Sequence, residues 1–350
     1  KKILFTLIEI CFFFIWNLLN YKKQNNKQNK ENNENILICR NQFYSISLKD
    51  VSMEYYHLDA NLKNYDISIS NFYWDTKNKS FTNLINLYLV LLKNTPKIVV
   101  LSSYAPNYER EMSQPNLLML NYFKNKFKFK LIFAWFDTCS ENFAKNNIMP
   151  TYPVADCHAV LENPLLDFND NIENIRNKIL PIFVSYNYDS IFKPLDKDLD
   201  FAFLGQIGSY RDYRSSYIDQ LKKLNYNYKI ITKVREEQPT HAEYAEILGR
   251  AKIGINFSHS ARCHQLKSRV FETMLSGAML LESKNAQIDC YFKEFEDYVP
   301  FTDEEDLVKK IHYYLQNEEE RKRIAANGRN KTIKKYNGDI FWREIFNSLK

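Results

Sequence analysis

Short apolar runs alternate with longer amphipathic stretches from residue 35 to the end of the chain. Short runs predict buried strands, and apolar spacings of three and four predict helices. Such alternation is typical of α/β layers around parallel sheets. The predicted strands cover residues 36–39, 67–74, 97–103, 130–136, 159–162, 182–184, 200–204, 228–232, 253–257 and 278–282.

Helical patterns lie between most of these strands and also end the chain. They cover residues 81–93, 115–127, 213–224, 241–250, 267–276, 303–317, 318–336 and a last segment around Trp342. The polar stretch 187–200, which contains Pro194, interrupts the rhythm and indicates a linker. Two consecutive α/β units joined by a hinge predict a ligand cleft at the carboxyl ends of their strands.

The first thirty residues follow a different pattern. Residues 3–19 are apolar except for Thr6, Glu9 and Asn17, and lysines flank them on both sides. The run is slightly shorter than the roughly 20 residues that span a bilayer, and no small-residue cleavage site follows it. We expect a membrane anchor or an interfacial helix, followed by an Asn/Lys-rich tether. The alternative is a helix of the soluble fold. The flanking lysines favour a location in the cytoplasm or on the cytoplasmic face of the membrane.

Composition is consistent with a globular body that has more than one core. The chain has 350 residues, of which 45% are hydrophobic and 15% aromatic, and this suits two domains. Its net charge of +6 comes from 48 basic and 42 acidic residues without a basic stripe, so we expect no nucleic-acid partner. The scattered cysteines indicate reduced thiols and no structural metal. These cysteines are Cys11, Cys39, Cys139, Cys157, Cys263 and Cys290.

Residues 267–281 carry the strongest chemical signal, a predicted helix that leads through a glycine turn into a buried strand. Lys267 and Arg269 stand at the start of the helix, where the helix dipole attracts anions. Glu272 follows one turn later among apolar residues, and a buried carboxylate needs a partner. A pair of ligand hydroxyls, such as those of a ribose, would supply one. The alternative is a structural ion pair with Arg269 or with a neighbouring strand.

A second candidate segment follows the predicted strand 200–204. It contains Gly205, Gly208, Arg211 and Arg214. Glycines let the backbone approach a phosphate closely, and arginines pair with phosphate oxygens. A tight turn with solvated arginines is the alternative.

Polar residues also follow two other predicted strands. His259 and Ser260 come after strand 253–257 and are candidates to bind a diphosphate or a sugar. Asp137 comes directly after strand 130–136. Its carboxylate is a candidate base for an acceptor hydroxyl, or alternatively a cap of the next turn.

Together these segments resemble the bacterial glycosyltransferase group 1 superfamily of GT-B fold, and in particular its CgeB-like (spore-maturation-protein-type) members. The resemblance rests on the hinge 182–194, F-A-F-L-G at 201–205, R-V-F-E at 269–272 with Gly277, and the segment 306–328. It covers the C-terminal half well and the N-terminal half in outline.

The resemblance implies two Rossmann-like domains that face each other across a cleft. After the segment 1–30, residues 31–188 would form the acceptor-side domain and residues 189–335 the domain that binds the nucleotide sugar. Residues 336–350 would form a C-terminal helix that packs back on the N-terminal domain.

The resemblance also implies an activity: transfer of a sugar from a nucleotide-diphosphate sugar to a glycan, lipid-linked or protein acceptor, without a cofactor or metal. Glu272 matches the glutamate that contacts the donor ribose, and Lys267 and Arg269 stand where basic groups approach the phosphates. A second glutamate of the group is replaced here by His264. Group 1 enzymes are usually retaining; for an inverting reaction, Asp137 is the first choice of base. The alternatives are a sugar-nucleotide epimerase and a non-catalytic GT-B-like binding partner tethered at the membrane.

Overall fold

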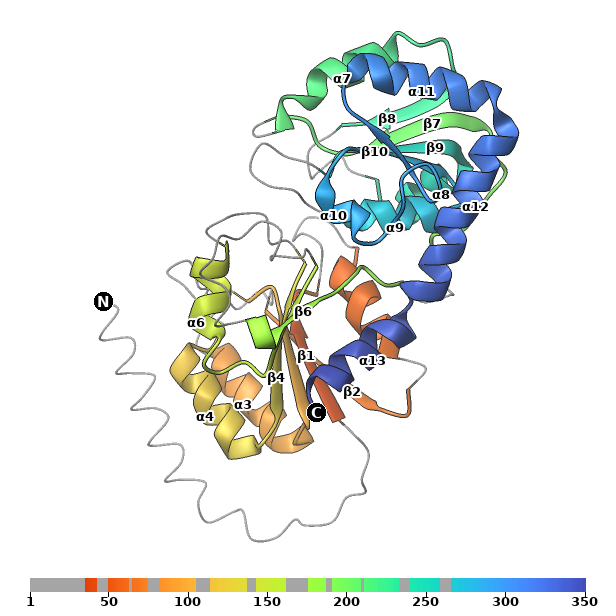
Figure 1. Cartoon of the computed structure of the whole chain (residues 1–350). Helices are drawn as coiled ribbons and strands as arrows, with labels where there is room; N and C mark the ends of the chain where they lie inside the picture. The colour runs from red at the N-terminus through yellow and green to blue at the C-terminus, as the bar shows by residue number, and fades with distance from the viewer. Residues whose placement is uncertain are drawn as a thin grey trace. The chain divides into compact units, whose positions relative to one another are not determined.

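The structure is a computed structural model of the chain (Figure 1). It describes residues 35–42, 50–62, 65–74, 82–104, 114–136, 143–161, 176–186, 191–208, 211–232, 239–258 and 266–350. The predicted anchor at residues 3–19 lies outside these ranges. Within them, no helix combines the length and the apolar character needed to cross a membrane.

The first half of the chain builds a six-stranded parallel sheet in the order β2-β1-β3-β4-β5-β6. β1 and β3 are adjacent and β2 lies outside β1, so the strand order reverses at β1. The strands are β1 (Asn35–Arg40), β2 (Ser68–Tyr73), β3 (Ile98–Ser102), β4 (Lys130–Trp135), β5 (Cys157–Val160) and β6 (Ile179–Pro181).

Helices cover this sheet. α3 (Thr82–Asn94) and α4 (Leu117–Phe127) pack on each other through Tyr88, whose ring centroid lies 5.7 Å from that of Phe123. Short helical segments complete this half of the chain. They are the π-helical turns η2 (Tyr55–Asp59) and η3 (Ala144–Ile148) and the single turns α2 (Ala60–Leu62) and α6 (Met149–Thr151).

The second half builds a five-stranded parallel sheet in the order β11-β10-β9-β7-β8. Here the order reverses between β7 and β9, which are hydrogen-bonded neighbours. The strands are β7 (Leu199–Leu204), β8 (Tyr228–Ile231), β9 (Ala251–Asn256), β10 (Met279–Ser283) and β11 (Val299–Phe301).

Both faces of this second sheet are buried under helices. α7 (Arg214–Lys222) and α11 (Glu304–Gln316) cover one face, and α8 (His241–Arg250) and α9 (Ser268–Leu275) cover the other (Figure 1). α8 begins with a capping box, in which Thr240 and Glu243 satisfy each other's backbone N–H groups. The short helix α10 (Ala286–Asp289) follows β10. Burial on both faces explains why these strands are mainly apolar in the sequence.

The last two helices are α12 (Glu318–Lys335) and α13 (Gly338–Ser348). α13 lies against the first half of the chain. Trp342 is fully buried, and its indole N–H donates to the carbonyl oxygen of Leu58 over 3.2 Å. The hydroxyl of Tyr65 likewise donates to the carbonyl oxygen of Asp339 over 2.9 Å.

The predicted α/β rhythm is confirmed, although the short helical segments at 55–62 and 144–151 and helix α10 were not predicted, and two strands differ. The strand predicted at 182–184 is wrong: β6 ends at Pro181, and the apolar residues that follow are buried without continuing the sheet. The backbone N–H of Ile182 still donates to the carbonyl oxygen of Val160 (2.7 Å) as the chain leaves the sheet. Strand β11 was not predicted, because it has only three residues and contains Pro300.

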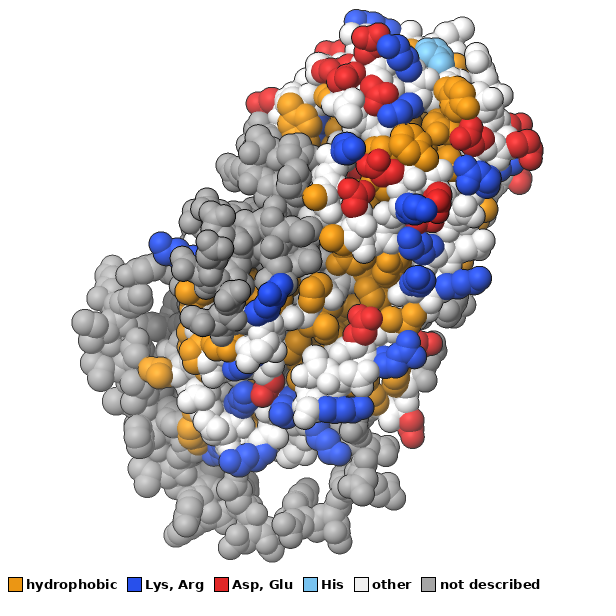
Figure 2. Space-filling view, in the orientation of Figure 1, with side chains coloured by type: hydrophobic (Ala, Val, Ile, Leu, Met, Phe, Trp, Pro, Cys, Tyr) orange, Lys and Arg blue, Asp and Glu red, His pale blue; other side chains and the backbone are white. Residues whose placement is uncertain are grey.

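Acidic and basic side chains are interspersed on the face of the molecule that Figure 2 shows. The described cysteines Cys39, Cys157 and Cys290 are free thiols.

Candidate functional site

The reversal of strand order between β7 and β9 marks a position where open α/β sheets bind ligands. The turn 205–208 leaves the carboxyl end of β7, and residues 257–258 leave the carboxyl end of β9. Gly208 has a φ of +99°, a conformation that side chains with a Cβ rarely adopt. Predicted site residues therefore come together at this edge of the second sheet.

Glu272 lies on α9 and is buried, with 2% of its surface exposed. Its Oε1 accepts a hydrogen bond from the hydroxyl of Tyr186 (2.5 Å), and its Oε2 accepts one from the hydroxyl of Tyr244 (2.6 Å). Burial raises the pKa of both phenols well above the ordinary value, and the carboxylate beside them adds to the shift. Both tyrosines therefore stay protonated and act as donors.

Arg269 lies one turn before Glu272 and shares Tyr244 with it. Its Nε donates to the Tyr244 hydroxyl over 3.2 Å, and its Nη1 donates to Oδ1 of Asn256 over 3.0 Å. Burial works against its charge, but Tyr244 and Glu272 outweigh that effect and raise the pKa of the guanidinium. A Cβ placed on Gly205 would lie 3.0 Å from Nη1, so the guanidinium touches the end of β7.

The donor capacity of Arg269 is not used up by these contacts. A guanidinium has five N–H groups, and Nη2 of Arg269 donates to no other residue in the part of the chain that the structure describes. A fixed cation with spare donors beside a glycine turn is suited to an anionic ligand.

Arg214 is buried, and its guanidinium holds the two loops of the edge together. Its Nη2 donates to the carbonyl oxygen of Phe257 (2.6 Å) and its Nη1 to that of Gln206 (3.1 Å). Arg211 donates from Nη1 to Oε1 of Gln206 over 3.0 Å. The predicted phosphate-binding arginines thus lie at the site, with Arg214 engaged by backbone carbonyls of both loops.

The remaining predicted residues divide into two groups. Lys267 is half-buried and occupies the N-cap position of α9. His259, Ser260 and Asp137 lie outside the described residues, as does His264.

One buried polar residue close to Asn256 was not among the predicted site residues. Glu282 on β10 is 0% exposed and accepts hydrogen bonds from Nδ2 of Asn256 (2.6 Å) and from the backbone N–H of Ser258 (2.7 Å). β9 and β10 pair in a register that sets Glu282 opposite Asn256. The sequence signal is a charged residue inside the apolar strand M-L-L-E.

Side chains from the first half of the chain also lie near Tyr186 and the start of α8. The buried ring of His57 lies 5.1 Å, between centroids, from the rings of both Tyr186 and Phe136. Burial lowers the pKa of His57 to about 4, so the ring is neutral at pH 7. A carboxylate oxygen of Asp50 accepts from the backbone N–H of His241 over 2.8 Å, at the N-terminus of α8. Phe136 directly precedes the predicted base Asp137.

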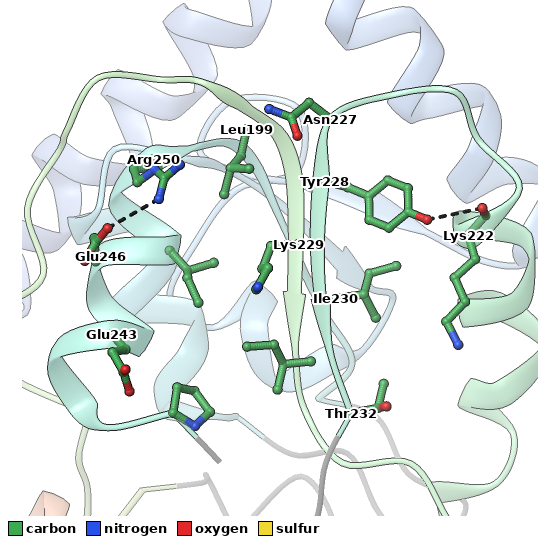
Figure 3. Close-up of a pocket in the computed structure, with 13 residues that line it drawn as sticks. Leu199, Lys222, Asn227, Tyr228, Lys229, Ile230, Thr232, Glu243, Glu246 and Arg250 are labelled. Atoms are coloured by element: carbon green, nitrogen blue, oxygen red, sulfur yellow. Dashed lines mark hydrogen bonds and ion pairs between the residues drawn. The ribbon is translucent and has the colours of Figure 1, made fainter. Parts of the chain in front are cut away.

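A separate hollow of about 870 Å³ lies along the edge strand β8 and helix α8 (Figure 3). Apolar side chains such as Ile231 and Ile247 and charged ones such as Lys229 and Arg250 line it. The described residues that line it include none of the predicted site residues. The hollow is at the edge of the sheet, one strand away from the reversal between β7 and β9.

Comparison with known proteins agrees with this geometry. Residues 189–347 match the family model described as glycosyl transferase-like. No curated protein matches the chain significantly.

Several solved structures are similar to the chain over most of its length. A glycosyltransferase from Rickettsia africae is 13% identical, with a TM-score of 0.61, and the match covers 91% of this chain and 98% of that one. HepE from Anabaena in complex with UDP is 9% identical, with a TM-score of 0.57, over 90% of this chain and 99% of that one. A sucrose-phosphate synthase from Thermosynechococcus elongatus is 11% identical, with a TM-score of 0.57, over 90% and 100%.

These similarities and the two parallel sheets establish the GT-B fold, with two Rossmann-like α/β units. The fold class expected from the sequence is confirmed. The family match falls on the half of the chain that carries Arg269, Glu272 and the turn 205–208.

Proposed function

We propose that the chain is a glycosyltransferase that moves a sugar from a nucleoside diphosphate sugar to an acceptor hydroxyl. The observation that carries the proposal is the guanidinium of Arg269, held by Tyr244 and Asn256 against Gly205 at the strand-order reversal. It lies within the region that matches the glycosyl transferase-like family model. HepE, which has a similar fold, was solved with UDP and with UDP-glucose, so UDP is the first nucleotide to test.

The donor diphosphate would lie between the turn 205–208 and the start of α9. The spare N–H donors of Arg269 and the ammonium of Lys267 would face it there, with first-turn amides of α9 behind them. As the bond to the sugar breaks, negative charge grows on the departing diphosphate, and fixed cations stabilise that charge. We propose that these side chains do so without a metal ion.

Glu272 is assigned to the donor ribose. Both of its oxygens already accept from tyrosine hydroxyls, and only 2% of the residue is exposed. A ribose hydroxyl would therefore replace the hydroxyl of Tyr186 on Oε1, while Tyr244 stays on Oε2. Tyr244 is the better anchor because it also binds Arg269.

The acceptor would bind on the side of residues 31–188. We propose that the transferred sugar retains its configuration, in line with the group 1 resemblance. For an inverting reaction, Asp137 is the proposed base.

The proposal also includes membership of the CgeB-like subtype and a glycan, lipid-linked or protein acceptor. It further includes a location in the cytoplasm or at the cytoplasmic face of the membrane, with association through residues 3–19.

The direct test incubates the full chain with UDP-glucose, other UDP-sugars and GDP-sugars, together with a glycan and lipid extract, and identifies products by mass spectrometry. We expect a glycosylated acceptor and free nucleoside diphosphate. Arg269→Ala should lower the rate at least a hundredfold, since it removes a charge that stabilises the leaving group. Arg250→Ala is the matched control, because its exposed ion pair with Asp198 lies at the far end of α8.

Other results would favour one of the alternatives or contradict part of the proposal. Conversion of the donor sugar without a glycosylated product would favour the epimerase alternative. Absence of any turnover by a folded chain that also binds no nucleotide would favour a non-catalytic role. Transfer that stops in EDTA and recovers with Mg²⁺ would contradict the metal-independent part of the proposal alone.

A further inference from the structure

Glu282 is a buried carboxylate whose described partners are all uncharged. Its Oε2 accepts from Asn256, and its Oε1 accepts from the backbone N–H of Ser258 and the hydroxyl of Ser283. No lysine or arginine forms an ion pair with it in the part of the chain that the structure describes. Burial of a carboxylate is costly, and it raises the pKa of Glu282. Apolar residues fill most of the same strand, so a charge at this position calls for an explanation.

The hydrogen bonds of Glu282 impose a direction on its neighbour. Both of its oxygens accept from N–H groups, so the amide of Asn256 must turn Nδ2 towards Glu282. Its Oδ1 then faces the other way and accepts from Nη1 of Arg269 over 3.0 Å. If the amide were reversed, its N–H₂ group would face the guanidinium, and two donors repel each other.

The second oxygen of Glu282 acts on the loop that follows β9. The backbone N–H of Ser258 donates to it over 2.7 Å, so the first residues after β9 are fixed to β10. Arg214 holds the carbonyl oxygen of the adjacent Phe257. One carboxylate thus orients both the guanidinium and the loop at the edge where the diphosphate would bind.

We propose that Glu282 is a positioning residue for the donor diphosphate, which fixes Arg269 through Asn256 and residues 257–258 after β9 through Ser258. The inference rests on the proposed function and adds a residue that touches no substrate. It predicts that donor binding depends mainly on which of Glu282 and Asn256 donates and which accepts. The charge and the volume of either residue should matter less.

Three variants of the full chain test this arrangement of donors and acceptors. In Glu282→Gln, the oxygen of the new amide still accepts from the Ser258 N–H, and its N–H₂ group faces Asn256. The Asn256 amide must then rotate, so that its N–H₂ group faces the N–H donors of Arg269. In Asn256→Asp, two carboxylates face each other. In the double variant, the new glutamine amide donates to one oxygen of the new aspartate, and Arg269 donates to the other. The double variant therefore restores a matched set of donors and acceptors.

The readout is binding measured by calorimetry with UDP and uridine, and with GDP and guanosine. In this proposal Arg269 contacts the diphosphate group, which a nucleoside lacks. The ratio of the affinity for the diphosphate to that for its nucleoside therefore reports on Arg269. We expect each single variant to lower this ratio about tenfold and the double variant to restore most of it. Glu305→Gln, an exposed glutamate on α11, is the matched control and should leave the ratio unchanged.

The outcomes separate this inference from the proposed function. If the wild type binds a diphosphate better than its nucleoside and Glu282→Gln keeps the same ratio, the inference is overturned and the function stands. A folded double variant that fails to recover also overturns it, because a purely structural role would then explain the losses. A wild type that binds neither diphosphate overturns the proposed function, and the inference falls with it.

Discussion

Among the described residues, two tyrosine hydroxyls and no basic side chain bind the carboxylate oxygens of Glu272. Tyr186 comes from the segment after β6 and Tyr244 from α8, so the carboxylate links chain segments from both halves of the protein. Hydrogen bonds from neutral donors can keep a buried carboxylate satisfied without neutralising it. This leaves Arg269, which shares Tyr244, with a net positive charge for a ligand.

Replacement of Tyr186 tests the proposed exchange with the ribose. Tyr186→Phe leaves Oε1 of Glu272 without a donor until a ribose hydroxyl arrives, so we expect nucleotide affinity to rise several-fold. The free energy of unfolding of the unliganded chain should fall by about 1–3 kcal/mol for the same reason. Calorimetric titration with UDP and GDP measures the first effect and urea unfolding the second.

Tyr244→Phe is the contrasting variant. It removes a hydroxyl that binds both Glu272 and Arg269, so it should weaken nucleotide binding. A nucleotide affinity that falls equally in both tyrosine variants would show that the Tyr186 hydroxyl is not displaced.

His57 makes stability depend on pH. Its folded pKa of about 4 lies below the ordinary value of 6.5, so the unfolded chain binds the extra proton between these values. The contribution of His57 to the free energy of unfolding is therefore fully present above pH 6.5 and is lost as the pH falls towards 4. From pH 7 to pH 5 the loss due to His57 is about 2 kcal/mol. Urea unfolding at both values should show a smaller acid loss in His57→Phe than in the wild type.

The exposed His312 provides the control for that experiment. His312→Gln should retain the full acid loss. An unchanged acid loss in His57→Phe would show that His57 does not stay buried and neutral in the folded chain.

At the scale of elements, the sequence predicts strands that are buried on both faces, because helices cover both sides and the strands are mainly apolar. It does not locate β6 correctly, since apolar residues 182–184 are buried by packing without pairing. Nor does it foresee the partners of Glu272. Tyr186 and Tyr244 are distant in sequence, and only the packing of α8, α9 and the segment after β6 brings their hydroxyls to one carboxylate.

The turn after α9 offers a test at this scale. Gly277 has a φ of +69°, and a Cβ there would lie 2.9 Å from Cγ of Pro194. Gly277→Ala should lower the free energy of unfolding by about 2 kcal/mol, from left-handed strain and the contact with the linker. The neighbouring variant Ser276→Ala is the control. It removes a buried hydroxyl that has no hydrogen-bond partner among the described residues, so stability should stay equal or rise. Equal stabilities of the two variants would contradict the close packing at Gly277.

At the scale of the whole chain, several contacts among the described residues connect the first half with elements of the second. They include the bonds of α13 to Leu58 and Tyr65, the bond of Tyr186 to Glu272, and that of Asp50 to the N-terminus of α8. The last two lie around the proposed donor site. Nucleotide binding should therefore stabilise the chain as a unit and raise its unfolding temperature in a single transition.

Thermal unfolding of the full chain with UDP and GDP, for the wild type, Arg269→Ala and the control Arg250→Ala, is the decisive test of the donor site. A nucleotide at about 100 times its dissociation constant adds about 2.7 kcal/mol of stability. We predict that one nucleotide raises the unfolding temperature of the wild type and of Arg250→Ala, and that Arg269→Ala loses the response. A well-folded wild type that responds to neither nucleotide, or an Arg269→Ala variant that responds fully, would contradict the donor site described above.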